Sequence, residues 1–111
     1  MNMHNDELAQ HLTIQERTTA DTTTLFLQGK LDLATASTFK QSAEPVVEQA
    51  DITFKLNLSE LSYIDSTGIG ILVTLLKRRH QLQAPFVVEE IPPKIKRLFE
   101  MTGIMKFLVV Q

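Results

Sequence analysis

The feature that most constrains the fold of this chain is a repeated change of hydrophobic period along its 111 residues. Apolar side chains alternate at two-residue spacing over 12–18 and again over 22–30, which is typical of strands, and Thr19-Ala20-Asp21 between them are turn formers. From 36 to 50 the apolar spacing becomes three or four residues, which is typical of one face of a helix. We therefore expect a two-stranded hairpin, with Gly29 closing its second strand, followed by a helix.

Strand-like and helix-like spacings of apolar residues continue to alternate towards the C-terminus. Alternating or continuous apolar runs predict three more strands, at 52–58, 86–88 and 107–110. Helical spacing predicts two more helices, one over 67–82 after a loop at 59–66 and one opened by Pro92-Pro93. Pro45 lacks an N–H group and is expected to kink or restart the first helix near Glu44. This order predicts an α/β fold, a single domain in which a mixed sheet of about five strands packs against about three to four helices.

Composition excludes several classes of protein. The chain is 43% hydrophobic and 22% charged with a net charge of −2, so it carries no electrostatic footprint for nucleic acid. It has no cysteine, and its three histidines (4, 11 and 80) lack ligand spacing, so we expect neither a metal site nor a cofactor. Residues 1–10 contain no Lys or Arg and read as a flexible leader. The longest uncharged run of the most apolar region, 66–76, is too short to insert into a membrane, and we expect a cytoplasmic protein.

The most informative segment is the entry into the predicted helix at 67–82. Asp65-Ser66-Thr67 are all residue types that cap helix N-termini, and spacing does not decide which of them is the cap. Gly68 and Gly70 each cost a helix ~1 kcal/mol relative to Ala, so either the sheet or a partner is expected to approach the backbone here. Two interpretations remain open: a plain cap with tight helix–sheet packing, or a phosphorylation site, since a helix N-terminus favours an anion.

Enzymatic interpretations of this segment fail on residue identity. A nucleophile elbow needs glycine two residues before the serine, where this chain has Ile64. A dinucleotide-binding fingerprint needs a third glycine, where this chain has Val73. We therefore expect a protein that is not an enzyme.

The predicted helix at 67–82 is apolar over about 200° of its circumference, wider than the ~100° stripe that a helix needs for its own core. Ile71 and Leu75 make up the excess. They form either the rim of the core or a patch for another protein, and the spacing leaves both open. The run Lys77-Arg78-Arg79-His80 ends the helix and is expected to be solvated, because cations favour a helix C-terminus.

Three separate segments of the chain resemble the stand-alone STAS domains of bacterial anti-sigma-factor antagonists. They are 57–70, which contains Ile64-Asp65-Ser66-Thr67-Gly68; Gly29-Lys30-Leu31-Asp32 with Thr35, Ala36, Phe39 and Lys40; and 93–103. The resemblance extends from His11 to Val110 and implies a STAS domain over 11–111 behind the leader.

The resemblance implies regulation by partner switching. In such a cycle the unphosphorylated antagonist binds an anti-sigma factor that is itself a serine kinase; phosphorylation releases it, and a metal-dependent PP2C-type phosphatase restores it. By position, Ser66 is the phosphoacceptor and Thr67 a second hydroxyl beside it. The residues expected to bind the partner are Asp32, Asp65, Ser66, Thr67, Gly68, Ile71 and Leu75.

Two alternatives stay open at this stage. Asp32 has a structural interpretation, as a loop residue that caps the following helix near Thr35. The whole chain has another functional interpretation, as a STAS accessory subunit that stabilises a membrane-transporter ATPase complex without a phosphorylation cycle. The intact Asp65-Ser66 pair favours the antagonist.

Overall fold

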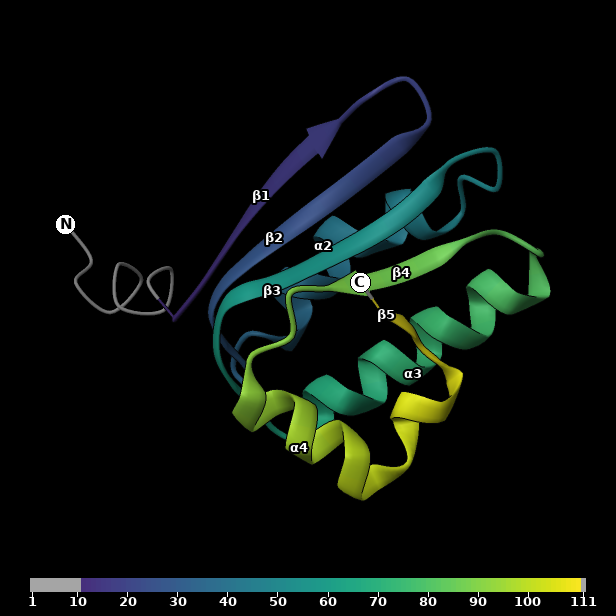
Figure 1. Cartoon of the computed structure of the whole chain (residues 1–111). Coiled ribbons are helices and arrows are strands. Elements are labelled where there is room, and N and C mark those ends of the chain that lie inside the picture. The colour runs from purple at the N-terminus through teal and green to yellow at the C-terminus, as the bar shows by residue number, and fades with distance from the viewer. Residues whose placement is uncertain (1–10, 111) are drawn as a thin grey trace, which may run out of the picture.

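The computed structural model describes residues 11–110 and contains one five-stranded sheet (Figure 1). Its strands are β1 (Leu12–Thr18), β2 (Thr22–Leu31), β3 (Thr53–Ile64), β4 (Phe86–Glu89) and β5 (Val109–Val110), in that spatial order. The β1–β2 pair is antiparallel and the other three pairs are parallel. The helices are α2 (Ala36–Val47), α3 (Ser66–Gln81) and α4 (Pro93–Thr102), followed by the 3₁₀ helix η1 (Ile104–Phe107). The predicted α/β fold with a mixed sheet is confirmed, with a fifth strand of only two residues.

The helices cover one face of the sheet, as the alternation of burial along the central strands shows. In β2 the side chains of Leu25 and Leu27 are buried, whereas Gln28 on the other face is exposed. In β3 the side chains of Phe54, Leu56 and Leu58 are all fully buried. The core therefore lies in a single layer between the sheet and the helices, and the opposite face of the sheet carries polar side chains.

Strand β3 is longer than the sequence predicts, which corrects the loop expected over 59–66. The strand continues to Ile64, and its pairing with β2 extends to Leu31 opposite Ile64. Two register shifts, between Phe26 and Gln28 and between Gly29 and Lys30, interrupt the ladder. Such irregularities break the two-residue alternation of buried and exposed side chains. The sequence after Leu58 therefore lacks the alternation typical of a strand, and a loop was predicted there.

Two predictions about single residues are also corrected. Gly29 does not close β2 but lies inside it, with φ at +110°, a conformation that glycine adopts without steric cost. Pro45 does not restart the first helix, because α2 runs without a break from Ala36 to Val47. Pro45 lies in the last turn of α2, so the one hydrogen bond that its missing N–H removes lies near the end of the helix, and the preceding turns remain intact.

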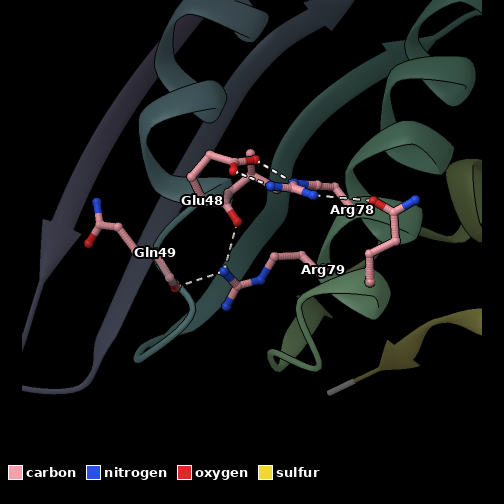
Figure 2. A network of polar contacts seen from close by, with 6 residues as sticks. Glu48, Gln49, Arg78 and Arg79 are labelled. Carbon is pink, nitrogen blue, oxygen red and sulfur yellow. Dashed lines mark hydrogen bonds and ion pairs between the residues drawn. The ribbon is translucent and has the colours of Figure 1, made fainter.

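Arg79 contradicts the expectation of a solvated helix end. Its side chain is only 1% exposed and lies on the face of α3 that packs against the core. The neighbouring Arg78 is accessible and forms an ion pair with Glu48 (Figure 2). Burial holds the pKa of the Arg79 guanidinium below its ordinary value, and the opposing effect of the Glu48 charge is smaller. Its two terminal nitrogens donate to four backbone carbonyls, those of Val47 (3.0 Å), Gln49 (2.8 Å), Ile52 (2.7 Å) and Pro85 (2.9 Å). The buried cation thus joins the α2–β3 connection to the α3–β4 connection.

Replacing Arg79 by Met should destabilise the fold by about 3–5 kcal/mol, because four carbonyls would lose a charged donor in a buried place. The matched control is Arg78→Met, one residue earlier on the accessible side of the same helix, which should unfold close to the unchanged protein. Urea denaturation followed by circular dichroism measures both. Equal midpoints for the two variants would show that the Arg79 hydrogen bonds do not hold the two connections.

Candidate functional site

The candidate site lies at the edge of the sheet where the parallel strands end and the helices begin. Strands β2, β3 and β4 run parallel, so their carboxyl ends reach the same edge, and α2, α3 and α4 start there (Figure 1). Helix N-termini present unpaired N–H groups and a partial positive charge. Three of them at one edge make it a favourable place for an anion.

Asp65 organises this edge through all of its polar groups. Its backbone N–H donates to the carbonyl of Leu31 (3.2 Å), and its carbonyl accepts from the N–H of Ile69 (3.0 Å). One carboxylate oxygen, Oδ1, accepts from the N–H of Gly68 (3.0 Å), and the other, Oδ2, accepts from the N–H of Leu33 (3.2 Å). Asp65 is therefore the N-cap that the sequence left undecided, and it also fastens the loop after β2 to the start of α3.

Ser66 follows the cap as the first residue of α3, so the helix begins one residue earlier than predicted. The Ser66 residue is exposed, whereas Thr67 is half-buried. An exposed hydroxyl on the first turn is accessible to an enzyme that modifies it. Of the two hydroxyls, Ser66 is the better presented.

Asp32 is a loop residue before α2 and not its cap, because the N-cap is Thr35 and no side chain caps the helix. Its Oδ1 accepts from the backbone N–H of Thr35 (3.1 Å), and its own N–H donates to Thr35 Oγ1 (3.0 Å). This reciprocal pair shapes the loop that enters α2. Leu33 in the same loop is bound by Asp65, so the loop that contains Asp32 is held against the start of α3, where Ser66 lies.

The two glycines of α3 differ in their surroundings. Gly68 is buried, and a Cβ there would lie 2.7 Å from Ile64 Cγ1 and 2.8 Å from the carbonyl oxygen of Leu31. The sheet therefore occupies the space beside Gly68, and the expected partner contact at this residue is corrected. Gly70 is exposed, and no atom of the described residues lies within 4 Å of the position of its Cβ.

Ile71 and Leu75 are also corrected as partner-binding residues. They are 7% and 6% exposed and pack in the core on the same stripe of α3 as Arg79. The excess apolar width that the sequence predicted does exist, but on the other flank of the helix. It consists of three half-buried side chains, those of Ile69, Val73 and Leu76.

Leu33 is the residue of this edge that the sequence reasoning missed. Its side chain is 76% exposed, while its N–H is held by the Asp65 carboxylate. An apolar residue directly after the loop residue Asp32 was the available signal, because such a position has no place in the core. An exposed leucine therefore lies in the loop that Asp65, the residue before Ser66, fastens to the start of α3.

Two further observations concern the described residues, 11–110. No helix in this part of the chain has the length and hydropathy to cross a membrane. Over the same residues, His, Asp and Glu side chains form no group of three or more that could hold a metal ion.

Comparison with known proteins assigns the class. The family model described as "Mlab, STAS domain" matches residues 14–110. The chain therefore belongs to the STAS domain family. A curated relative, the anti-sigma-B factor antagonist of Listeria monocytogenes, is 34% identical over 98 residues, which cover 88% of this chain and 85% of that protein.

Solved structures share the fold. An anti-sigma factor antagonist from Mycobacterium paratuberculosis aligns with a TM-score of 0.81 at 21% identity, over 89% of this chain and 84% of that one. The antagonist SpoIIAA of Bacillus in its phosphorylated form aligns with a TM-score of 0.69 at 19% identity, over 89% and 91% of the two chains. The resemblance to STAS-domain antagonists expected from the three sequence segments is thereby confirmed.

The two glycines provide a matched pair of variants. Gly68→Ala should destabilise the fold by about 1–3 kcal/mol, because the new methyl group would overlap Ile64 and the Leu31 carbonyl. Gly70→Ala should be neutral or stabilise by up to ~1 kcal/mol, because it adds helix propensity in open space. Thermal unfolding of both variants checks this, and equal melting temperatures would contradict the assigned contact between Gly68 and the sheet.

Proposed function

We propose that this chain is an anti-sigma-factor antagonist that binds an anti-sigma serine kinase at the Ser66 edge and is released when Ser66 is phosphorylated. The observation that carries the proposal is the exposed Ser66 hydroxyl at the first residue of α3. The relatives named anti-sigma-B factor antagonist support it. Further support comes from SpoIIAA, a structural neighbour solved in unphosphorylated and phosphorylated forms.

Phosphorylation of Ser66 changes the surface more than the fold. A phosphate adds about −1.5 to −2 charges, and a helix N-terminus stabilises an exposed anion by only ~0.3–1 kcal/mol. The carboxylates of Asp65 and Asp32 at the same edge oppose that gain, although each already accepts backbone N–H groups. The stabilisation by the helix N-terminus and the repulsion by the carboxylates are of similar size, so the phosphorylated domain should stay folded.

The same dianion has a much larger effect at an interface. Burying it against a partner without a matching cation costs several kcal/mol, which corresponds to a loss of about 100-fold or more in affinity. An exposed phosphoserine is also accessible to a PP2C-type phosphatase, which would restore binding. The proposed cycle takes place in the cytoplasm and needs no catalytic group from this chain.

The decisive test combines phosphosite mapping with binding to the cognate anti-sigma kinase. Incubation with the kinase and ATP should place the phosphate on Ser66. Ser66→Asp should melt like the unchanged protein but bind the kinase at least 100-fold more weakly. Thr67→Ala is the matched control and should still be phosphorylated.

Three outcomes would refute this function. They are phosphate only at another residue, normal kinase binding by Ser66→Asp, or affinity capture of a transporter ATPase in place of the kinase. The last outcome would favour the accessory-subunit alternative.

A second test concerns the exposed side chain of Leu33, in the loop that the Asp65 carboxylate binds. If the kinase covers this edge, Leu33→Ala should weaken binding about 5- to 30-fold, because a buried interface leucine would be lost. Met101→Ala is the control, since Met101 is equally exposed, at 76%, but lies in the last turns of α4. Calorimetric titration of both variants measures the difference, and equal affinities would remove Leu33 from the interface.

A further inference from the structure

A second surface of the molecule remains open along α3. The half-buried side chains of Ile69, Val73 and Leu76 form one wall of a groove of about 700 Å³, and the end of α4 with η1 forms the other. The remaining lining residues are Lys77, His80, Gln81, Thr102, Gly103, Ile104 and Phe107. The groove begins next to the Ser66 edge, since Ile69 also donates its N–H to the Asp65 carbonyl.

An exposed aromatic side chain adds to the apolar wall of the groove. Five large apolar side chains are exposed in the described part of the chain, and three of them, Leu98, Met101 and Phe107, belong to α4 and η1. Phe107 lines the groove and is 70% exposed. The groove therefore combines half-buried aliphatic side chains with an exposed aromatic one, a combination that is common at interaction sites.

The charges around the groove indicate what can occupy it. Its only ionisable lining residues, within 11–110, are Lys77 and His80, and no carboxylate lines it. A second copy of this chain would bring like charges together, which is unfavourable. An occupant with acidic side chains beside apolar ones would complement the groove.

The shape of the groove favours a helix. Ile69, Val73, Leu76 and His80 follow one another at spacings of four, three and four residues, so they form one stripe along α3. At a rise of 1.5 Å per residue the stripe is ~16 Å long, about three helical turns. An amphipathic helix laid into a groove of this kind presents apolar residues at matching spacing.

We infer that the groove receives an acidic amphipathic helix of the same anti-sigma partner that binds at Ser66. The inference rests on the proposed function, and continuity supports it, because the groove starts at Ile69, one turn after Ser66 on the same helix. The partner would then make two contacts with different roles. The Ser66 edge responds to phosphate, whereas the groove contributes affinity in both states.

This division of roles makes a quantitative test available. Phe107→Ala should weaken binding of the anti-sigma kinase about tenfold in the unchanged background. It should do so by the same factor in Ser66→Asp, since separate contacts contribute additively. Lys77→Glu should also weaken binding, and more strongly at low salt. Met101→Ala, outside the groove but equally exposed, should stay within twofold.

A cross-link can locate the partner segment directly. The chain contains no cysteine, so Val73→Cys supplies a single attachment point inside the groove. A maleimide photo-cross-linker there should attach to an acidic helical segment of the kinase, and mass spectrometry identifies the peptide.

The outcomes separate the two proposals. Unchanged binding by Phe107→Ala and Lys77→Glu, with binding still lost in Ser66→Asp, would overturn the groove and leave the proposed function standing. Unchanged binding in all three variants would overturn both. Cross-linking to a segment that is not an acidic helix would overturn the assigned occupant.

Discussion

One carboxylate, that of Asp65, holds the candidate site together. It accepts the N–H of Gly68 inside α3 and the N–H of Leu33 in the loop after β2, while the Asp65 backbone bonds to Leu31 and Ile69. Two segments that are about thirty residues apart in sequence are thereby held side by side. Because an ionised carboxylate makes stronger hydrogen bonds than a neutral group, this pair of bonds is a strong local constraint. The position of Ser66 follows from it.

Helix α3 is anchored at both ends by polar side chains of different kinds. At its start Asp65 accepts hydrogen bonds, and near its end the buried Arg79 donates hydrogen bonds to four carbonyls of two connections. Between them Leu72 is fully buried against the sheet. A helix held at three points presents its two free surfaces, the Ser66 edge and the groove beside Ile69, in a fixed relation. A partner can therefore contact both without first ordering them.

Prediction from the sequence succeeded for patterns that span a few residues. It failed where it required the rotation of a helix about its axis relative to the sheet. The order of elements, the mixed sheet and a helix cap among Asp65, Ser66 and Thr67 were foreseen. Ile71 and Leu75 were misplaced because helical spacing states which side chains share a face but not which face meets the sheet. Arg79 was missed for a related reason: its charge suggested solvent, although it follows Ile71 and Leu75 at four-residue spacing on the buried stripe.

The sequence by itself determined the α/β order, a helix start capped by one of Asp65, Ser66 and Thr67, and the residue types of the STAS segments, because these depend on neighbours within a few positions. Only the tertiary structure decided that the N–H of Leu33 binds the Asp65 carboxylate, that the sheet fills the space at Gly68, and that Arg79 is buried. Each of these depends on residues about thirty positions apart meeting across the β2–β3 pairing or the helix–sheet interface. The free energy of such contacts arises from packing and hydrogen bonds that no local pattern encodes.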